Sequence, residues 1–146
     1  HLGTHSSLRR GSGRRSFLVL GDGSQLTLDA IGELNFTGLQ LVTLSACQSA
    51  LGGATTDDGR GVEGLSAIVQ RGGAQHVIAS LWRVEDRSTA QLMREMYAAL
   101  ARAGTDAAGA LRASQLRIRN TRHGMSEPYR HPYYWAGFLT SASQQH

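Results

Sequence analysis

The sequence LQLVTLSAC, from Leu39 to Cys47, joins a run of apolar, strand-forming residues to the only cysteine of the chain. Gly38 precedes this run and the polar segment GGATTDDGRG follows it. The pattern predicts a short, buried central strand over Leu39–Ala46. Cys47 then lies at the carboxyl end of that strand, where ligands gather in open α/β sheets.

Apolar patterns on both sides of this strand predict an alternation of strands and helices. Before it, we expect a strand over Phe17–Leu20, a hairpin turn or an entry into a helix at Gly21-Asp22-Gly23, and a short helix near Leu28–Leu34. After it, we expect a helix over Val62–Gln70 stopped by Gly72-Gly73, a strand over His76–Leu81, helices capped by Ser88 and Asp106, and a strand over Tyr133–Leu139 introduced by Pro132. This alternation indicates an α/β fold with a mainly parallel sheet.

Length and composition predict one domain, residues 1–146, that can bury its own core without a disulfide or metal. A single cysteine and no signal-like apolar run favour a reducing, cytoplasmic setting. We also expect no membrane span, because no stretch approaches about 18 apolar residues. The net charge is +4 and every basic residue is arginine, which fits either an acidic partner or an arginine-favouring genome.

The segment RRGSGRR, from Arg9 to Arg15, is the most basic part of the sequence. It fits either an arm that contacts phosphates or a solvated basic loop. No aromatic residues are interleaved with these arginines, and no nucleic-acid-binding motif occurs. We therefore interpret the segment as a loop and expect no nucleic-acid partner.

His5 and Cys47 are the residues best suited to carry chemistry. A cysteine attacks strongly only as the thiolate, and a nearby histidine commonly generates that form near neutral pH. The alternative for Cys47 is an inert thiol that fills space in the core. Its place at a strand end, followed at once by Gln48 and Ser49, favours a nucleophile.

Four blocks of the sequence resemble one family, the CHAT domain of the caspase and separase clan of cysteine peptidases. In chain order they are HLGTH, TLSACQSALG, GVEGLSAIVQRGGAQHVIASLWRVED and HPYYWAGF. The resemblance covers nearly the whole chain and implies a three-layer αβα fold. The chain would be the C-terminal part of that domain, lacking its N-terminal strands. It also implies thiolate attack on specific protein substrates, no metal or organic cofactor, and an upstream regulatory region such as helical repeats.

The resemblance assigns roles to individual residues. Cys47 is the expected nucleophile and His5 its base, and the backbone N–H groups of Cys47 and Ser6 are the expected oxyanion donors. The family usually has glycine where this chain has Ser6, and serine keeps the N–H but loses glycine-only backbone angles. A caspase-like interaction module that has lost hydrolysis is the alternative function.

Substrate contacts are expected from the segment Ser80–Asp86 that follows the strand after the catalytic one. Asp86, or else Asp58, would pair with a basic residue just before the cleaved bond. Arg83 argues instead for an acidic residue, and Trp82 is either a packing residue or a substrate contact. Asp86 has a further interpretation, as a cap of the helix that begins near Ser88.

Two further expectations concern metals and loops. His1 and His5 are four residues apart, but no glutamate follows His1 as the zinc-peptidase motif requires, so we expect no metal site. The family commonly has histidine at His1, with a structural role implied. The glycine-rich segments Ser6–Ser16 and Gly52–Gly61 are expected to be mobile and to flank the catalytic crevice.

Overall fold

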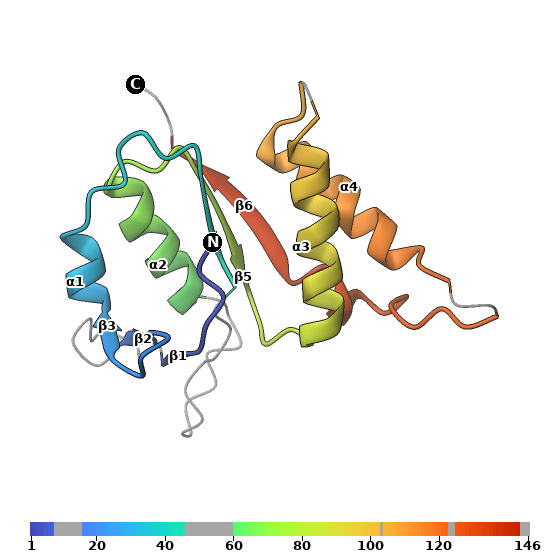
Figure 1. Ribbon diagram of the computed structural model, residues 1–146, viewed down its shortest axis with the longest axis horizontal. Helices are drawn as coiled ribbons and strands as arrows, with labels where there is room; N and C mark the ends of the chain where they lie inside the picture. The colour runs from blue at the N-terminus through green and yellow to red at the C-terminus, as the bar shows by residue number, and fades with distance from the viewer. Residues whose placement is uncertain (8–15, 46–59, 103, 123–124, 144–146) are drawn as a thin grey trace. The chain divides into compact units, whose positions relative to one another are not determined.

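The structure, a computed structural model, describes residues 1–7, 16–45, 60–102, 104–122 and 125–143, and for residues 60–63 the backbone only. It combines helices with two three-stranded sheets (Figure 1), which confirms the predicted α/β class. The chain divides into two compact units. The first is His1–Arg83 with Ser141–His146, and the second is Val84–Thr140.

Two parallel strands form the centre of the first unit. β4 (Leu41–Leu44) pairs in parallel with β5 (His76–Ser80), with Leu44 opposite Ala79. Both lie inside the ranges expected from the sequence, and their β-branched and apolar residues suit a sheet that is covered on its faces. The predicted central strand and the strand that follows it are therefore confirmed.

The third strand of this sheet, β6 (Phe138–Ala142), completes the order β4-β5-β6. The N–H of Ser143, just beyond it, donates to the carbonyl of Gln75 at 3.0 Å. The expected strand over Tyr133–Leu139 is wrong for its first five residues, because Pro132–Tyr134 form the 3-10 helix η2 and residues 135–137 form a turn. Proline fits the first position of a helical turn, where no backbone N–H is needed.

The second sheet is an antiparallel meander of three short strands. β1 (Ser6–Ser7), β2 (Phe17–Val19) and β3 (Gln25–Thr27) pair in chain order. The expected hairpin at Gly21-Asp22-Gly23 is confirmed, with Gly23 at a φ of 83°. The expectation of a mainly parallel sheet does not hold for these strands, because connections this short join neighbouring strands only in antiparallel fashion.

β3 leads directly into the short helix α1 (Leu28–Gly32), so the strand entering a helix is found as well. The hydroxyl of Thr27 accepts a hydrogen bond from the Ala30 N–H at 3.2 Å and caps the helix. Ile31 is the buried residue of α1 and packs into the core. The predicted helix near Leu28–Leu34 is confirmed with an earlier end.

Helix α2 (Arg60–Arg71) ends at the predicted glycine pair. The N–H of Gly73 donates to the Gln70 carbonyl at 2.9 Å, and the N–H of Ala74 donates to the Val69 carbonyl at 3.3 Å. These two bonds are those of a Schellman motif, and Gly73 supplies its left-handed residue with a φ of 110°. The chain thereby turns from α2 towards β5.

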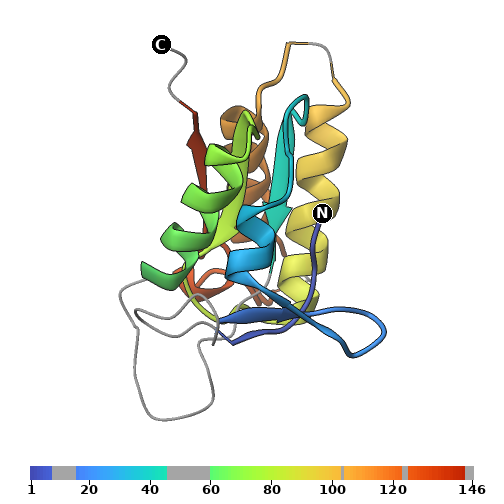
Figure 2. The same cartoon turned by 90° about the vertical axis from the view of Figure 1, so that its left-hand side faces the viewer.

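The core of the first unit combines the strands with α1 and α2. Helix α2 packs against β5, and α1 packs against α2 (Figure 2). The buried residues come from both sheets, both helices and the segments that connect them to the strands: Leu18, Ile31, Phe36, Val42, Leu44, Leu65, Val69, Ala74, Val77 and Ala79. The hairpin sheet is thus joined to the parallel strands through a shared core.

The second unit is built on two packed helices, α3 (Asp86–Leu100) and α4 (Ala107–Arg119), seen in Figure 1. The expected cap of α4 is confirmed, since the Asp106 carboxylate accepts from the Gly109 N–H at 2.6 Å. The buried faces carry Leu92, Met93 and Met96 from α3, and Ala107, Ala110, Leu111, Ser114 and Ile118 from α4.

Two apolar residues of these helices lie outside the buried faces. Tyr97 and Leu116 are 39% and 38% exposed. Leu111 and Ile118 are two turns apart and share a face, whereas Leu116 is rotated well away from them. An apolar residue inside a helical pattern is therefore not always part of its buried stripe.

Candidate active site

The N-terminal segment runs beside β4 in the parallel sense. Leu2 forms an isolated parallel bridge with Leu44. The Leu2 N–H donates to the Thr43 carbonyl at 2.8 Å, and the Ser45 N–H donates to the Leu2 carbonyl at 2.9 Å. The described residues thus bring the segment that contains His5 next to the strand that precedes Cys47.

A second attachment fixes the backbone around His5 itself. The His5 carbonyl accepts a hydrogen bond from the Val19 N–H at 2.9 Å, and the Thr4 hydroxyl donates to the Val19 carbonyl. The His5 side chain is exposed. Strand β2 therefore holds the backbone of His5 while its imidazole faces solvent.

Sequence reasoning missed the contact between Thr4 and Val19. It depends on the register of the hairpin sheet, which joins residues far apart in the chain. A hydroxyl residue directly before His5 was the only local signal for it.

Cys47 and Asp58 lie outside the residues that the structure describes, as does Gly52–Gly59, most of the second expected mobile segment. Of the first expected mobile segment, Ser6–Ser16, only the ends are described. Ser6 and Ser7 form β1 and Ser16 is 1% exposed. Both described ends of this segment therefore belong to the hairpin sheet or lie against it.

Ser6 occupies an ordinary extended position. It lies opposite Leu18 in the antiparallel ladder and is 5% exposed. The neighbouring bond between Val19 and His5 makes the Ser6–Leu18 pair a non-hydrogen-bonded one, so the Ser6 N–H is directed away from β2. None of the described non-glycine residues has a positive φ. A serine at this position therefore needs no glycine-only backbone angle.

The expected substrate-contacting segment crosses from one unit to the other. Trp82 and Arg83 follow β5 at the end of the first unit, where Trp82 is 37% exposed and Arg83 is also exposed. Asp86 belongs to the second unit and is the first residue of α3, with an exposed side chain. Asp86 therefore lies at the start of helix α3.

The cap of α3 is Glu85, and the interpretations of Ser88 and Asp86 as caps are wrong. The Glu85 carboxylate accepts from the Ser88 N–H at 2.6 Å, and the Ser88 hydroxyl donates to the Glu85 carbonyl at 3.0 Å. Burial raises the pKa of the Glu85 carboxyl, but hydrogen bonds from Ser88 and Arg87 outweigh it and hold this pKa below its ordinary value. Glutamate is an uncommon cap, so the sequence favoured Ser88.

His1 lies close to the start of the site. A Cβ added to Gly3 would lie 3.4 Å from Nε2 of His1 and 3.5 Å from the Ser45 hydroxyl, so both groups border Gly3. Within the described ranges, no three His, Cys, Asp or Glu side chains gather as a metal site would require. The helices described there include none long and apolar enough to cross a membrane.

Fold and site together define a mixed α/β domain in which a histidine-bearing segment runs parallel to the strand before a cysteine. The model of the CHAT domain family matches residues 1–143 of the 146-residue chain. The chain belongs to the CHAT domain family, which is related to the caspase-like peptidases. No curated protein matches the sequence.

Proposed function

We propose that the chain is the C-terminal part of a caspase-like cysteine peptidase, with Cys47 as nucleophile and His5 as its base. The parallel bridge between Leu2 and Leu44 carries the proposal. His5 and Cys47 each lie three residues beyond one of the bridged residues. A register that continued past the bridge would bring the two side chains opposite each other on one face.

The proposed chemistry needs only these two side chains and backbone donors. His5 takes the proton of the Cys47 thiol, and the thiolate attacks the carbonyl carbon of the scissile peptide bond. His5 then protonates the leaving amine. The N–H groups of Ser6 and Cys47 are the proposed oxyanion donors, a role that membership of the family supports. A water hydrolyses the thioester.

The family supports further parts of the proposal. They are a complete three-layer αβα domain with additional strands upstream, a specific protein as substrate, and an upstream regulatory region such as helical repeats. The single thiol supports a reducing, cytoplasmic setting. No metal or organic cofactor enters the proposed reaction.

Labelling with an irreversible peptidyl electrophile tests the dyad, in the chain with its natural upstream region. We expect one adduct at Cys47, detected by intact mass spectrometry and peptide mapping. His5→Asn should slow this labelling by about 100-fold, since general-base assistance of this kind contributes about 10²–10⁴.

His131→Asn is the matched control. It also removes an imidazole, but asparagine can still accept the Tyr133 N–H that His131 accepts at 3.2 Å. Equal labelling rates in both variants and the parent would remove His5 from the mechanism. A Cys47 that stays unlabelled in the folded full-length protein would favour an interaction module that has lost hydrolysis.

For substrate choice, we propose that a basic residue, arginine before lysine, precedes the cleaved bond. Asp86 is the first candidate for the pairing carboxylate and Asp58 the second, and Trp82 is a further proposed substrate contact. The exposed Arg83 is the competing signal, since it would attract an acidic residue. Asp86 also sits where the dipole of α3 favours a carboxylate, which gives it a role independent of substrate.

A panel of fluorogenic peptides separates these assignments. We expect kcat/KM to be highest after arginine and to fall about tenfold for that substrate in Asp86→Asn, on the scale of one lost charge-assisted contact. If kcat/KM for the arginine substrate falls in Asp58→Asn but not in Asp86→Asn, Asp58 is the carboxylate that pairs with the substrate. Faster cleavage after aspartate, reduced in Arg83→Gln, would reverse the predicted charge preference.

A further inference from the structure

A groove of about 350 Å³ lies along α3 in the second unit, and none of the proposed catalytic residues lines it. Its lining residues come from α3 and from the segment after α4: Arg87, Ala90, Gln91, Arg94, Pro128 and Tyr129. Arg87 and Arg94 are seven residues apart, which is about 10 Å along one face of a helix. Two guanidinium groups therefore stand along one groove.

Neighbouring carboxylates are already engaged by other groups. Glu95 pairs with Arg117 at 2.9 Å, and Glu127 pairs with Arg122 at 3.2 Å and with Arg130 at 3.0 Å. In the part of the chain that is described, no carboxylate forms an ion pair with Arg87 or Arg94, and both side chains are exposed. Glu85 of the same unit attracts Arg87 without forming an ion pair, so both guanidinium groups remain open to the carboxylates of a partner.

The wall opposite α3 is fixed by several contacts. The Arg130 N–H donates to the Glu127 carbonyl at 3.3 Å and closes a turn with Pro128 at its second position. The Tyr129 ring, 8% exposed, packs edge-on against Tyr134 at a centroid distance of 5.5 Å. The wall needs little ordering when a partner binds, which lowers the cost of association.

The floor of the groove is also held in place. The Gln91 side chain donates to the Thr121 hydroxyl at 3.5 Å, and that hydroxyl donates to the Arg117 carbonyl at 3.0 Å. Ala90, exposed beside it, adds a small apolar surface between the two arginines. The groove thus alternates charge, a small apolar surface and charge along α3.

We propose that this groove binds an acidic peptide segment of a protein partner, with two carboxylates about 10 Å apart. In a polyproline II segment, which has three residues per turn and a rise of about 3.1 Å per residue, residues three apart share one face at about this spacing. The two guanidinium groups would form ion pairs with the two carboxylates. Ala90 and Pro128 would contact a peptide side chain that lies between those carboxylates. Tyr129 is too buried to offer a ring face to a base, which favours a peptide over a nucleic acid.

Fluorescence anisotropy with a labelled peptide that carries two glutamates three positions apart tests the groove. The measurement uses the full chain with Cys47→Ser, so that its result is independent of the proposed peptidase activity. We expect saturable binding that weakens as salt is added. The Kd should rise about fivefold in Arg94→Gln and more than about tenfold in the double variant that also carries Arg87→Gln.

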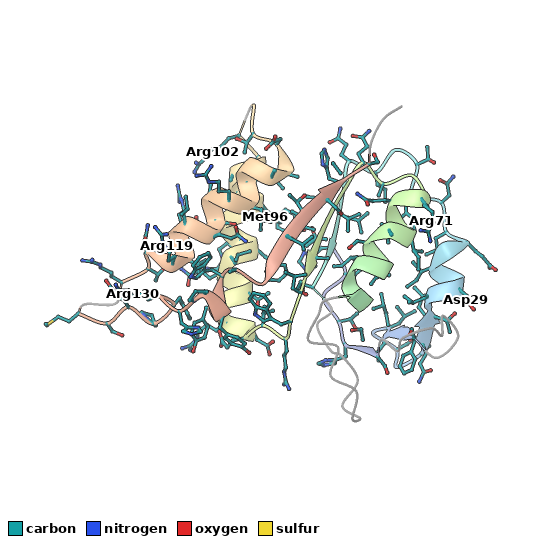
Figure 3. All side chains as sticks on the ribbon, turned by 180° about the vertical axis from the view of Figure 1, so that it is seen from behind. Asp29, Arg71, Met96, Arg102, Arg119 and Arg130 are labelled. Atoms are coloured by element: carbon teal, nitrogen blue, oxygen red, sulfur yellow. The ribbon has the colours of Figure 1, made fainter. Side chains whose placement is uncertain are left out.

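Arg102→Gln is the matched control, because Arg102 is exposed and lies just beyond the other end of α3 (Figure 3). It should change binding less than twofold. Equal losses in all variants would overturn the groove as the site, because they would indicate attraction to net charge only. Equal binding of the glutamine version of the peptide, no saturable binding below millimolar concentration, or tighter Arg94-dependent binding of a DNA oligonucleotide would each overturn the proposal.

Discussion

The first unit depends on backbone pairing, whereas the second depends on side-chain packing between two helices. In the first, hydrogen bonds between strands and the Schellman end of α2 fix where each segment runs. In the second, the buried faces of α3 and α4 meet, and ion pairs such as Arg117–Glu95 lie at the surface. The comparison teaches that backbone geometry limits substitution in the first unit and side-chain volume limits it in the second.

The largest effect is expected at the end of α2, from Gly73→Ala. The residue has a φ of 110°, and an added Cβ would lie 2.7 Å from the Thr37 hydroxyl and 2.8 Å from Thr37 backbone atoms. Backbone strain and the clash should together lower the free energy of unfolding by about 4 kcal/mol. Urea denaturation followed by tryptophan fluorescence measures the loss.

Gly38→Ala separates strain from clash. Gly38 has a similar φ of 87°, but an added Cβ would meet no atom within 4 Å. We expect a loss of about 1 kcal/mol there. Similar losses at Gly38 and Gly73 would contradict the view that close backbone approach makes Gly73 special.

In the second unit, Met96→Ala should have the next largest effect. Met96, labelled in Figure 3, is 0% exposed on α3, and its truncation leaves a cavity. We expect the free energy of unfolding to fall by about 3 kcal/mol, against less than about 1 kcal/mol for Leu116→Ala at the exposed face of α4. Thermal melts by circular dichroism compare the two. Equal losses would mean that α3 is not packed through this face.

A smaller effect is expected from Glu85→Ala, which removes the cap of α3. The loss should be about 1 kcal/mol at neutral pH. Because the pKa of Glu85 is lowered in the folded chain, its contribution is fully present above the ordinary value of 4.5. It is lost as the pH falls through the lower folded-state value. Urea melts across pH 3–7 should therefore converge for the two proteins at the acid end, and a constant difference would contradict this origin.

The smallest effect is expected from Arg117→Gln, which breaks the ion pair with Glu95. Both side chains are partly open to solvent, at 56% and 31%. We expect a loss of about 0.5 kcal/mol or less, and less still in high salt. A loss above 2 kcal/mol in a thermal melt would show that surface charge, as well as packing, holds the second unit together.

The sequence predicted best where local pattern and burial agree. The apolar runs at β4 and β5, the glycine pair after α2 and Asp106 before α4 each carry a short-range signal, and each prediction is confirmed. Prediction from the sequence failed where the structure of a segment depends on a residue far along the chain. Ser6 was expected in a mobile, glycine-rich segment, and its pairing with Leu18 depends on a hairpin that no local pattern around Ser6 indicates.

The candidate site was predictable to a different extent. The structure places the segment that contains His5 beside β4 through Leu2. No local pattern indicated the groove along α3, because its second wall comes from a turn more than thirty residues away. The pairing of His5 with Cys47 stays a prediction.

The attachment of Leu2 to β4 has a consequence for local opening of the chain. Leu2 is 38% exposed and is not among the buried core residues, so its two backbone bonds can break without disrupting the core. Such an opening costs much less than global unfolding. In hydrogen exchange, the amide of Ser45 should therefore exchange faster than that of the buried Ile78. If His5 is the base of Cys47, the fraction of molecules closed at this bridge sets the fraction of enzyme that is competent at any moment.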